Sequence, residues 1–421
     1  MAHDGTNRVF AEQGTDAKAL FAEMDAITAG DQRWDDPKNL KASYWAGDDV
    51  VAVMHQAYAR HIDDNAIYGA SLFPSLMRYE AEVVAMALDM LEAPEGAAGG
   101  ITTGGTESIL MAVRTARDWG RVHRPGALAP EIILPETAHP AFEKAAQVVG
   151  MTVVRMKDSP GWRADPAAME AAIGENTVML VASAPPYPYG IVDPITEIAA
   201  LARSHGLWMH VDGCIGGFLL PFLHELGEPV PPFDFRVDGV DSISADLHKF
   251  GYSGRGASLL LLRDGANEIH QRFSSDAWPS GTYSTLNFGG SRNGGAIASS
   301  WAVMRYLGRA GYRERVASVV ATKRAIAEGL AADGRLTVLG KPQGANICIV
   351  SDGLDMVAIA EGLDERGWLT GRLQRPSGLL FLITPRHAGI VDALLADLLA
   401  VADDVASGRR TAAGSQAVYV G

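Results

Sequence analysis

The sequence has only two cysteines, Cys214 and Cys348, and both lie in apolar stretches. Two isolated cysteines cannot build a disulfide framework, and their surroundings favour a reducing compartment. No apolar run approaches the ~20 residues that a bilayer-spanning helix requires, and the first residues lack the basic and apolar regions of a signal peptide. We therefore expect a cytoplasmic protein with no membrane span.

The chain also has fewer basic than acidic residues. The chain carries 36 Lys and Arg against 50 Asp and Glu, which gives a formal net charge of −14. This balance argues against nucleic acids and anionic membrane surfaces as partners, and solubility is its simplest explanation. No His, Cys and carboxylate cluster has zinc-like spacing, and no Gly-x-Gly-x-x-Gly pattern follows the first strand. We expect a small-molecule substrate and no metal.

Alternating β and α patterns organise the chain from residue 75 to about residue 310. Hydrophobic residues make up 48% of the sequence, which is ample for a large core. The predicted strands are short and mostly β-branched or apolar, at residues 131–134, 152–155, 177–182, 207–211, 242–245 and 258–262. Helical patterns include residues 75–92, 106–119 and 195–204. This alternation predicts βαβ units and a mainly parallel sheet.

The pattern changes near residue 310, and this change sets the predicted domain organisation. Residues 61–310 form the large domain, and residues 311–406 form a smaller α+β domain. In the small domain the predicted elements are helices at 313–332, 354–366 and 390–406 and strands at 346–350 and 379–384. Residues 1–60 have no core of their own, so we expect them to wrap the body or a partner subunit. Residues 407–421 are expected to form a flexible tail.

An aspartate and a lysine carry the most informative pattern. Asp212 closes an apolar run, and the pair His248-Lys249 follows the next β pattern. A lysine amine can form a Schiff base with the aldehyde of pyridoxal phosphate (PLP), and an aspartate can keep the pyridine nitrogen protonated, so that the ring accepts electrons. Alone, such a lysine is usually a surface group and such an aspartate usually belongs to a turn. Together, at this spacing, they favour a PLP site.

A glycine-rich stretch containing Gly104, Gly105 and Thr106 leads into a predicted helix. Glycines let the backbone approach a ligand closely, and N–H groups at a helix N-terminus bind phosphate. Helix capping by a threonine, with Glu107 close behind, explains the same residues equally well.

Three further segments are candidates for the site. His139 follows a predicted strand and could stack on a flat cofactor, although it could equally cap the helix after it. Tyr187 lies in a proline-rich loop at the carboxyl end of a strand, where ligands bind in open α/β sheets. Ser291-Arg292 offers a hydroxyl and a guanidinium for a phosphate or carboxylate, or it simply forms a surface turn.

Taken together, the chain resembles the sphingosine-1-phosphate lyase family, within the PLP-dependent group II decarboxylase superfamily. The matching stretches run in order from about residue 65 to residue 400. They are residues 72–76 (LFPSL), 80–84 (EAEVV), 103–110 (TGGTESIL), 138–146 (AHPAFEKAA), 231–237 (PPFDFRV), 289–292 (GGSR) and 375–378 (RPSG).

The resemblance implies an α/β fold of fold-type I (aspartate aminotransferase-like), with a large, mainly parallel-sheet domain and a smaller C-terminal α+β domain. It also implies a homodimer with shared active sites. By the same resemblance, Lys249 is expected to bind PLP covalently, Asp212 to contact the pyridinium and His139 to stack on the ring. The other expected cofactor contacts lie in the glycine-rich stretch, beside Asp212 and Lys249, and in the GGSR segment: Gly104, Gly105, Thr106, His210, His248 and Ser291.

The resemblance also assigns catalytic and substrate contacts. Tyr187 and Tyr44 match tyrosines near the reacting carbons, and the resemblance places Tyr44, like Ser291 and Arg292, in the neighbouring subunit. The substrate contacts that it implies are Tyr68, His248, Arg292 and Arg255.

Three departures from the family pattern bear on the substrate. Tyr68 stands where the family has a histidine that helps to hold the substrate phosphate. Gly213 replaces the alanine that usually follows the pyridinium aspartate, which we expect to leave more room beneath the ring. Arg255 replaces a lysine.

The resemblance implies a retro-aldol carbon–carbon lyase acting on a phosphorylated long-chain amino alcohol. The same residues could instead serve a PLP-dependent amino-acid decarboxylase, with Arg292 or Arg255 gripping an acidic side chain. A catalytically inactive protein of this fold is disfavoured, because Lys249 and Asp212 are both present.

Overall fold

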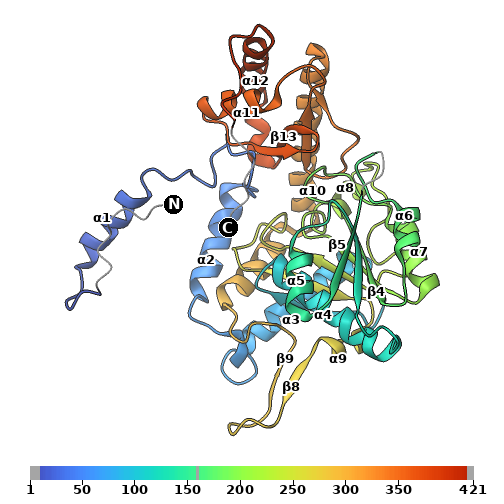
Figure 1. The fold of residues 1–421 in the computed structure, drawn as a ribbon. Helices are drawn as coiled ribbons and strands as arrows, with labels where there is room; N and C mark the ends of the chain where they lie inside the picture. Colours follow the sequence, from blue (N-terminus) through green and yellow to red (C-terminus); the bar gives the residue numbers. More distant parts are fainter. Residues whose placement is uncertain (1–9, 158–160, 415–421) are drawn as a thin grey trace.

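A seven-stranded sheet forms the centre of the larger part of the molecule (Figure 1). The computed structural model describes residues 10–157 and 161–414. The sheet order is β1-β7-β6-β5-β4-β2-β3. Its strands are β1 (Ala98–Thr102), β2 (Glu131–Pro135), β3 (Thr152–Met156), β4 (Thr177–Ser183), β5 (Trp208–Asp212), β6 (Ser242–Ala245) and β7 (Ser258–Leu262).

The sheet is mainly parallel, as the alternating pattern predicts. Strands β3, β2, β4, β5 and β6 run parallel to their neighbours, whereas β7 and β1 pair in antiparallel fashion. Strand β1 was not predicted, because its Ala-Gly-Gly start has low β propensity. Gly99 is needed there, since a Cβ atom would lie 2.6 Å from the carbonyl oxygen of Leu260.

Helices cover both faces of the sheet, so its strands are buried on both sides. On one face, Met179 and Val181 pack in the cluster that contains α4 (Gly105–His123) and α5 (Ala141–Val149). On the other, Leu180 and Ala182 pack in the cluster that contains α3 (Pro74–Met90) and α7 (Ile195–His205). The remaining helices of this part are short: α6 (Pro166–Ala172), α8 (Leu220–Glu225) and α9 (Glu268–Gln271).

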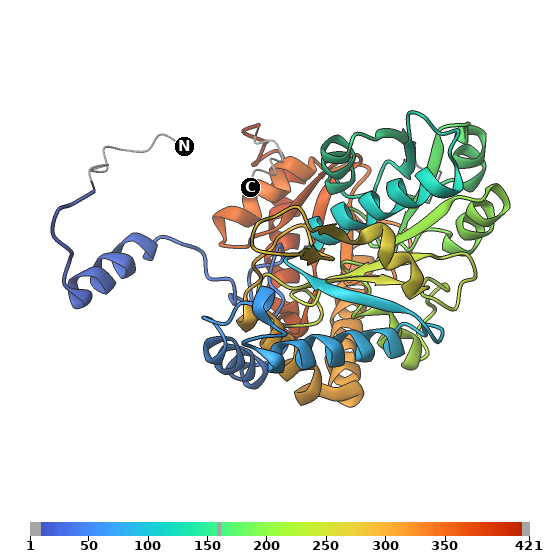
Figure 2. The same ribbon diagram turned by 90° about the horizontal axis from the view of Figure 1, so that it is seen from below.

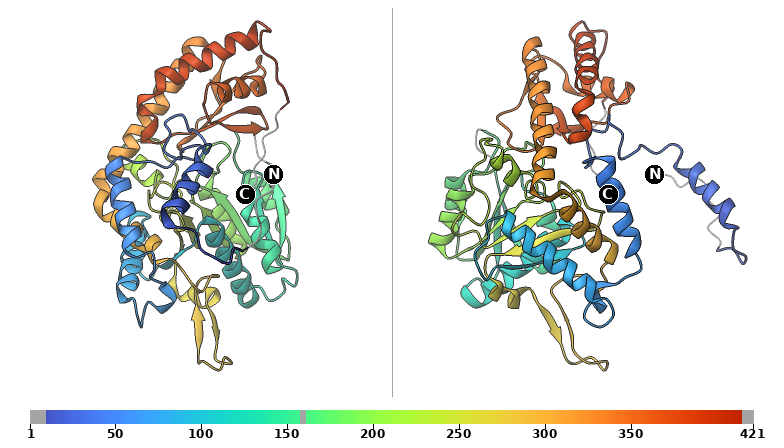
Figure 3. Two further views of the ribbon diagram at one scale, coloured as in Figure 1. Left: turned by 90° about the vertical axis from the view of Figure 1, so that its left-hand side faces the viewer. Right: turned by 180° about the vertical axis from the view of Figure 1, so that it is seen from behind.

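A long helix, α10 (Gly294–Asp333), connects the large part to the small one (Figure 3). It contains the helix predicted at residues 313–332 but begins about 20 residues earlier, with a break in helical geometry at Gly308. The small part is an antiparallel sheet ordered β10-β11-β13-β12, with two helices. Its elements are β10 (Thr337–Val338), β11 (Asn346–Val350), β12 (Gly371–Gln374), β13 (Ser377–Leu382), α11 (Met356–Glu365) and α12 (Val391–Ala406).

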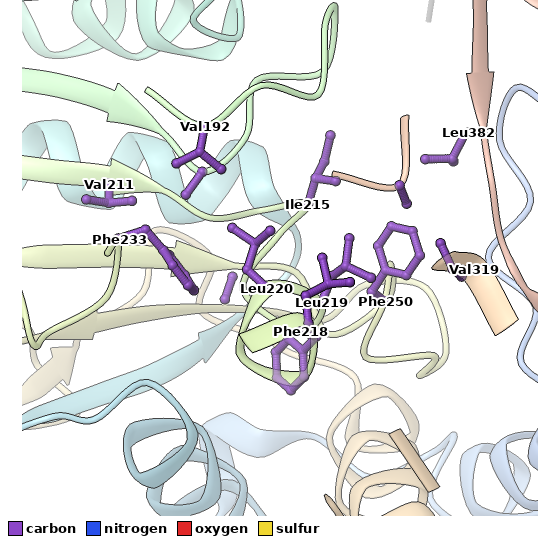
Figure 4. Close-up of a cluster of buried hydrophobic side chains, with 14 of the residues drawn as sticks. Val192, Val211, Ile215, Phe218, Leu219, Leu220, Phe233, Phe250, Val319 and Leu382 are labelled. Carbon is purple, nitrogen blue, oxygen red and sulfur yellow. The ribbon is translucent and has the colours of Figure 1, made fainter. Parts of the chain in front are cut away.

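One hydrophobic cluster extends from the large part into the small part (Figure 4). Val211 and Phe250 of the large part belong to the same cluster as Val319 of α10 and Leu382 of β13. Burial of apolar surface is worth about 25 cal/mol per Å², so this shared core holds the two parts together.

The N-terminal residues behave as two different segments. Leu40 is fully buried: its N–H donates to the carbonyl of Leu369, and its carbonyl accepts from the N–H of Leu382. Helix α2 (Asp48–Arg60) then packs along α10. By contrast, α1 (Ala17–Thr28) buries none of its residues and stands away from the body (Figure 2).

A two-stranded hairpin, β8 (Phe273–Ser275) and β9 (Tyr283–Thr285), also projects from the body (Figure 1). Within residues 10–157 and 161–414, no helix is long and apolar enough to cross a membrane. Part of the predicted C-terminal tail, residues 415–421, lies outside the described residues.

Candidate active site

The chemistry-bearing residues gather at the carboxyl ends of the parallel strands. Asp212 is the last residue of β5, Lys249 follows β6, and Tyr187 follows β4. Carboxyl ends of neighbouring parallel strands meet at one edge of a sheet, where ligands bind in folds of this kind. We call the residues around this edge the lysine group: His139, Asp212, Asp246, His248 and Lys249.

An ion pair stands at the centre of the lysine group. Lys249 Nζ lies 2.7 Å from Asp246 Oδ2, and the two side chains are 22% and 2% exposed. Burial disfavours the charged amine, but the charge of Asp246 and its hydrogen bond more than offset it and raise the pKa of Lys249. Burial likewise opposes the carboxylate, yet the charges of Lys249 and His248 lower the pKa of Asp246. Both groups are therefore ionised at neutral pH.

Asp246 was not among the predicted site residues. Its position three residues before Lys249, between an apolar strand and the His-Lys pair, is the signal that could have indicated it. A Cβ atom on Gly105 would lie 2.8 and 2.9 Å from the two Asp246 oxygens and 3.1 Å from Cys214 Sγ. The start of α4 can approach this carboxylate so closely only because residue 105 is glycine.

Asp212 faces the site with one oxygen held from behind. Its Oδ1 accepts hydrogen bonds from the backbone N–H of Cys214 at 3.0 Å and from Ser244 Oγ at 3.4 Å. His210, a predicted cofactor contact, is fully buried with both ring nitrogens hydrogen-bonded to serines. The prediction that His210 touches the cofactor is therefore wrong, because no face of its ring is open to a ligand.

His139 presents an exposed imidazole beside Asp212 and Lys249. Its Nδ1 accepts the N–H of Ala141 at 3.1 Å, so the alternative interpretation, that it caps the following helix, is confirmed. The surrounding protein lowers the pKa of His139 by burial, with the charge of Asp212 opposing the effect. A neutral ring with a fixed nitrogen and an open face is suited to stacking on a flat cofactor.

The start of α4 and His248 form the side of the site suited to an anion. A Cβ atom on Gly104 would lie 3.6 Å from His248 Cε1, so the two are in contact. N–H groups of the first helical turn have no partner within the helix, and they favour negative charge. Among the described residues, the buried His248 Nδ1 and Asp246 Oδ1 have no hydrogen-bond partner. Unmatched buried polar atoms mark a place for a polar ligand or water. The first helical turn and His248 therefore fit the cofactor phosphate, whereas the Asp246 oxygen can only accept a hydrogen bond.

Tyr44 lies in the site of its own chain. Its ring packs edge-on against Phe250 with centroids 5.4 Å apart, and the guanidinium of Arg255 lies 5.5 Å from its centroid. Tyr44 also lies close enough to Lys249 to interact with it electrostatically. The expectation that Tyr44 comes from the neighbouring subunit is therefore corrected.

The loop that carries Tyr187 is held by the small part of the molecule. Asn346 of β11 donates to the carbonyl of Pro186 at 3.1 Å, and the N–H of Gly344 donates to the carbonyl of Gly190 at 2.8 Å. The Tyr187 hydroxyl lies 3.5 Å from the carbonyl oxygen of Lys41. Loop, small part and N-terminal segment therefore meet beside the lysine group.

A second set of predicted residues, which we call the loop group, consists of Tyr68, Ser291 and Arg292. Tyr68 ends a short helix, Ala66–Tyr68, and is 53% exposed. Ser291 Oγ accepts from Asn65 Nδ2 at 2.9 Å in an open surface depression. None of these hydrogen bonds involves the lysine group of the same chain.

Arg292 is not free to grip a substrate anion. Its guanidinium is paired with both oxygens of Glu80 at 2.7 and 3.0 Å and also donates to the carbonyl of Ile101 at 2.8 Å. Breaking such a part-buried bidentate pair would leave Glu80 without its partner. The predicted role of Arg292 as a substrate ligand is thus corrected. Its guanidinium instead links Glu80 of α3 to Ile101 of β1, just before the glycine-rich stretch.

Glu107 joins this stretch to the GGSR segment, and it too was missed as part of the site. One oxygen accepts from the N–H and hydroxyl of Thr103 at 2.7 and 2.5 Å, and the other accepts from the N–H groups of Phe288 and Gly289 at 2.8 and 3.1 Å. The capping interpretation anticipated only the first pair. Glu107 therefore ties the glycine-rich stretch to the segment that leads to Ser291.

The expectation that Gly213 leaves more room beneath the cofactor ring is wrong. A Cβ atom there would lie 2.9 Å from the carbonyl oxygen of Ser244 and 3.3 Å from Ile243 Cγ2. It would point at strand β6 rather than into the site. The glycine is therefore required by the close approach of β5 and β6 in this chain.

The fold and the site define a PLP-dependent enzyme of fold-type I. Residues 4–351 match the pyridoxal-dependent decarboxylase conserved domain. The structure also superposes on Lactobacillus brevis glutamate decarboxylase with a TM-score of 0.82 over 96% of both chains, at 19% sequence identity. Likeness at that identity concerns the fold alone. The match to this domain shows that PLP is the cofactor of the chain.

Within this class, the chain belongs to the sphingosine-1-phosphate lyase family. It is 39% identical to the Arabidopsis thaliana enzyme over 82% of this chain and 64% of that one, and 37% identical to the Oryza sativa enzyme over 96% and 76%. The structure of the Burkholderia pseudomallei lyase aligns with a TM-score of 0.91 at 36% identity, over 97% of this chain and 95% of that one. The chain spans about two thirds of the Arabidopsis and rat relatives it matches.

Proposed function

We propose that the chain is a PLP-dependent carbon–carbon lyase. Its substrate would be a phosphorylated long-chain amino alcohol of the sphingosine-1-phosphate type, cleaved to a fatty aldehyde and phosphoethanolamine. The observation that carries this proposal is the 36% identity and 0.91 TM-score against the bacterial lyase over nearly the whole chain. The likeness to solved structures such as the glutamate decarboxylase, at 19% identity, concerns the fold alone and does not favour either reaction.

Each member of the lysine group has a proposed role. Bound PLP supplies an aldehyde that bonds amines and a ring that withdraws electrons. Lys249 would hold the cofactor covalently, and Asp212 would face the pyridine nitrogen and keep it protonated. His139 would stack on the ring. The first turn of α4 (Gly104, Gly105 and Thr106), with His248, would bind the cofactor phosphate.

Cleavage requires one proton to leave the C3 hydroxyl of the substrate and another to reach C2. The C2–C3 bond breaks, the aldehyde forms at C3, and the electron pair left at C2 is quenched by the second proton. Lys249, which Asp246 keeps charged in the structure, is a suitable donor to C2. Tyr187 and Tyr44 are the proposed alternatives, because their hydroxyls lie on segments that border the same edge of the sheet.

A decarboxylase is the second candidate, and the match to the pyridoxal-dependent decarboxylase domain favours it. Such an enzyme needs a cation for the substrate's carboxylate. With Arg292 engaged by Glu80, the exposed Arg255 beside Tyr44 is the remaining predicted cation.

A product assay separates the two candidates. The PLP-loaded protein is incubated with a panel of phosphorylated amino alcohols of increasing chain length and with amino acids, and aldehyde and carbon dioxide are both measured. The lyase proposal expects aldehyde from long-chain phosphorylated substrates and no carbon dioxide. Carbon dioxide from an amino acid, without aldehyde from any amino alcohol, would overturn it.

We also propose a homodimer with shared active sites. Helix α1 exposes four large apolar side chains that none of the described residues covers: Leu20, Phe21, Met24 and Ile27, which are 44–72% exposed. Exposed apolar patches on an isolated helix are typical of an interface. Tyr68 and Ser291, the exposed members of the loop group, would then complete the lysine group of the second subunit. The two free, buried thiols suit a cytoplasmic location.

A further inference from the structure

A ladder of five buried polar side chains lies behind Asp212. Trp208, His210 and Asp212 alternate along β5 and so share one face of the sheet. Ser242 and Ser244 do the same on β6, and the parallel register pairs His210 with Ser242 and Asp212 with Ser244. The five side chains interleave under α5, where Phe142 packs edge-on against the His210 ring at 5.9 Å.

The ladder is connected end to end by hydrogen bonds. Trp208 Nε1 lies 2.9 Å from Ser242 Oγ, which lies 2.8 Å from His210 Nδ1. His210 Nε2 lies 3.2 Å from Ser244 Oγ, which lies 3.4 Å from Asp212 Oδ1. All five residues are at most 7% exposed, so bulk water does not compete with these contacts.

The two ends of the ladder determine its direction. An indole N–H can only donate and a carboxylate can only accept. If every hydrogen is used, Ser242 accepts from Trp208 and donates to His210 Nδ1. His210 then carries its proton on Nε2 and donates to Ser244, which donates to Asp212. The reverse tautomer would leave the Ser244 oxygen and the Asp212 oxygen facing each other with no hydrogen between them. Burial lowers the pKa of His210 to about 4, so the ring is neutral at physiological pH.

We propose that His210 is a positioning residue for the reaction: as its Nε2–H tautomer, it orients the Ser244 hydroxyl so that this hydroxyl donates to Asp212. A hydrogen bond to a carboxylate favours the ionised form and fixes its orientation. Asp212 would therefore be held charged toward the pyridine nitrogen by a chain of groups that never touch the cofactor. The inference rests on the proposed role of Asp212 but not on the substrate.

Two pairs of variants test the ladder through cofactor affinity, measured by equilibrium titration of the apoprotein with PLP. Ser244→Ala removes the last donor, whereas Ser300→Ala removes a buried hydroxyl that bonds within α10 and serves as the matched control. A hydrogen bond to a charged group is worth about 1.5–3 kcal/mol, so Ser244→Ala should weaken PLP binding roughly tenfold or more. Ser300→Ala should leave it unchanged. Equal affinities for the two variants would overturn the proposal.

The second pair tests which nitrogen matters. A glutamine amide can reach the position of Nε2, whereas an asparagine amide reaches only that of Nδ1. His210→Gln should therefore keep PLP affinity and the visible absorption of the bound cofactor close to those of the parent. His210→Asn should lose about as much as Ser244→Ala. A purely structural histidine predicts equal damage from the two replacements, and that result would contradict the inference.

Neutron diffraction from deuterium-exchanged crystals of the PLP-loaded parent protein determines the direction of the hydrogen bonds in the ladder without any variant. The proposal expects deuterium on His210 Nε2, none on Nδ1, and the Ser244 deuterium directed at Asp212. Deuterium on Nδ1 would overturn it even if the variants fail to fold. Failure of the lyase assay with an intact ladder would count against the substrate alone.

Discussion

The lysine group and the loop group have opposite surroundings in the same chain. Asp212 and Asp246 are 7% and 2% exposed, and their hydrogen bonds come from neighbouring strands and turns. Tyr68 is 53% exposed, and Ser291 lies in an open depression at the surface. The difference teaches that the proposed cofactor-binding aspartates are fixed by contacts within one chain, whereas Tyr68 and Ser291, proposed to act at the substrate, are left exposed. Four predictions test this division, and a fifth concerns a buried histidine outside both groups.

Replacing Lys249 should have the largest effect. Lys249→Ala removes both the proposed covalent anchor and a proton carrier, and acid–base catalysis alone contributes roughly 10²–10⁴-fold. Aldehyde release should fall by at least about 10⁴-fold, and the visible absorption of bound PLP should be lost, while circular dichroism is unchanged. Lys341→Ala, at an exposed position, is the control. Peptide mapping after borohydride reduction that finds the pyridoxyl group on another lysine would refute the assignment.

Asp212→Asn should follow, because it keeps the shape and removes the charge facing the pyridine nitrogen. Preorganised electrostatic groups contribute about 10²–10³-fold, so turnover should drop by about that factor while PLP is still bound. Steady-state kinetics and PLP titration measure the two effects separately. Near-normal turnover would show that the ring works without this carboxylate.

Ser291→Asp tests whether the loop group acts across a subunit interface. The added negative charge should repel a phosphate and lower activity at least tenfold. Mixing this variant with Lys249→Ala should create heterodimers in which one of the two sites has an intact lysine and an intact serine. Recovered activity supports shared sites. If heterodimers form, as native mass spectrometry can show, and remain inactive, both residues belong to the same chain's site.

Tyr68→His should sharpen phosphate recognition in the loop group. An imidazolium forms a charge-assisted hydrogen bond worth about 1.5–3 kcal/mol, against about 1 for the phenol. KM for the phosphorylated substrate should fall by about tenfold, with kcat little changed. Tyr306→His, at another exposed tyrosine, should change neither constant. An unchanged KM in Tyr68→His would place the substrate phosphate elsewhere.

The smallest effect concerns stability in acid, away from both groups. His387 is buried, its Nδ1 accepts the N–H of Thr384, and its Nε2 lies 3.1 Å from the carbonyl of Asn39. Burial lowers its pKa to about 4, against about 6.5 when unfolded. The unfolded chain therefore binds more protons between these values, and stability is lost as the pH falls from about 6.5 to 4.

This group should contribute a slope of up to about 1.4 kcal/mol per pH unit. Urea unfolding of His387→Gln at several pH values should show a shallower decline than that of the parent, while activity at neutral pH is retained. An identical pH slope in the two proteins would mean that His387 does not titrate on unfolding.

Local sequence determined the fold class and much of the lysine group. Strand-sized runs alternating with helical periods specify a mainly parallel sheet, because period and length are properties of a segment. Asp212 and Lys249 could be read as partners, since residues that follow neighbouring parallel strands must meet at one edge. Even β6 and β7 were predicted with the bounds that the structure gives.

Tertiary structure alone decided which side chains are free to act. Arg292 is occupied by Glu80, which lies 212 positions away in the chain, so no local pattern could reveal that its guanidinium is unavailable. A side chain at position 213 would collide with β6 because β5 and β6 lie so close together. His210 is buried beneath the site because its register places it between Ser242 and Ser244. Periodicity is encoded along the chain, whereas burial and pairing depend on contacts between distant segments, which exist only once the chain has folded.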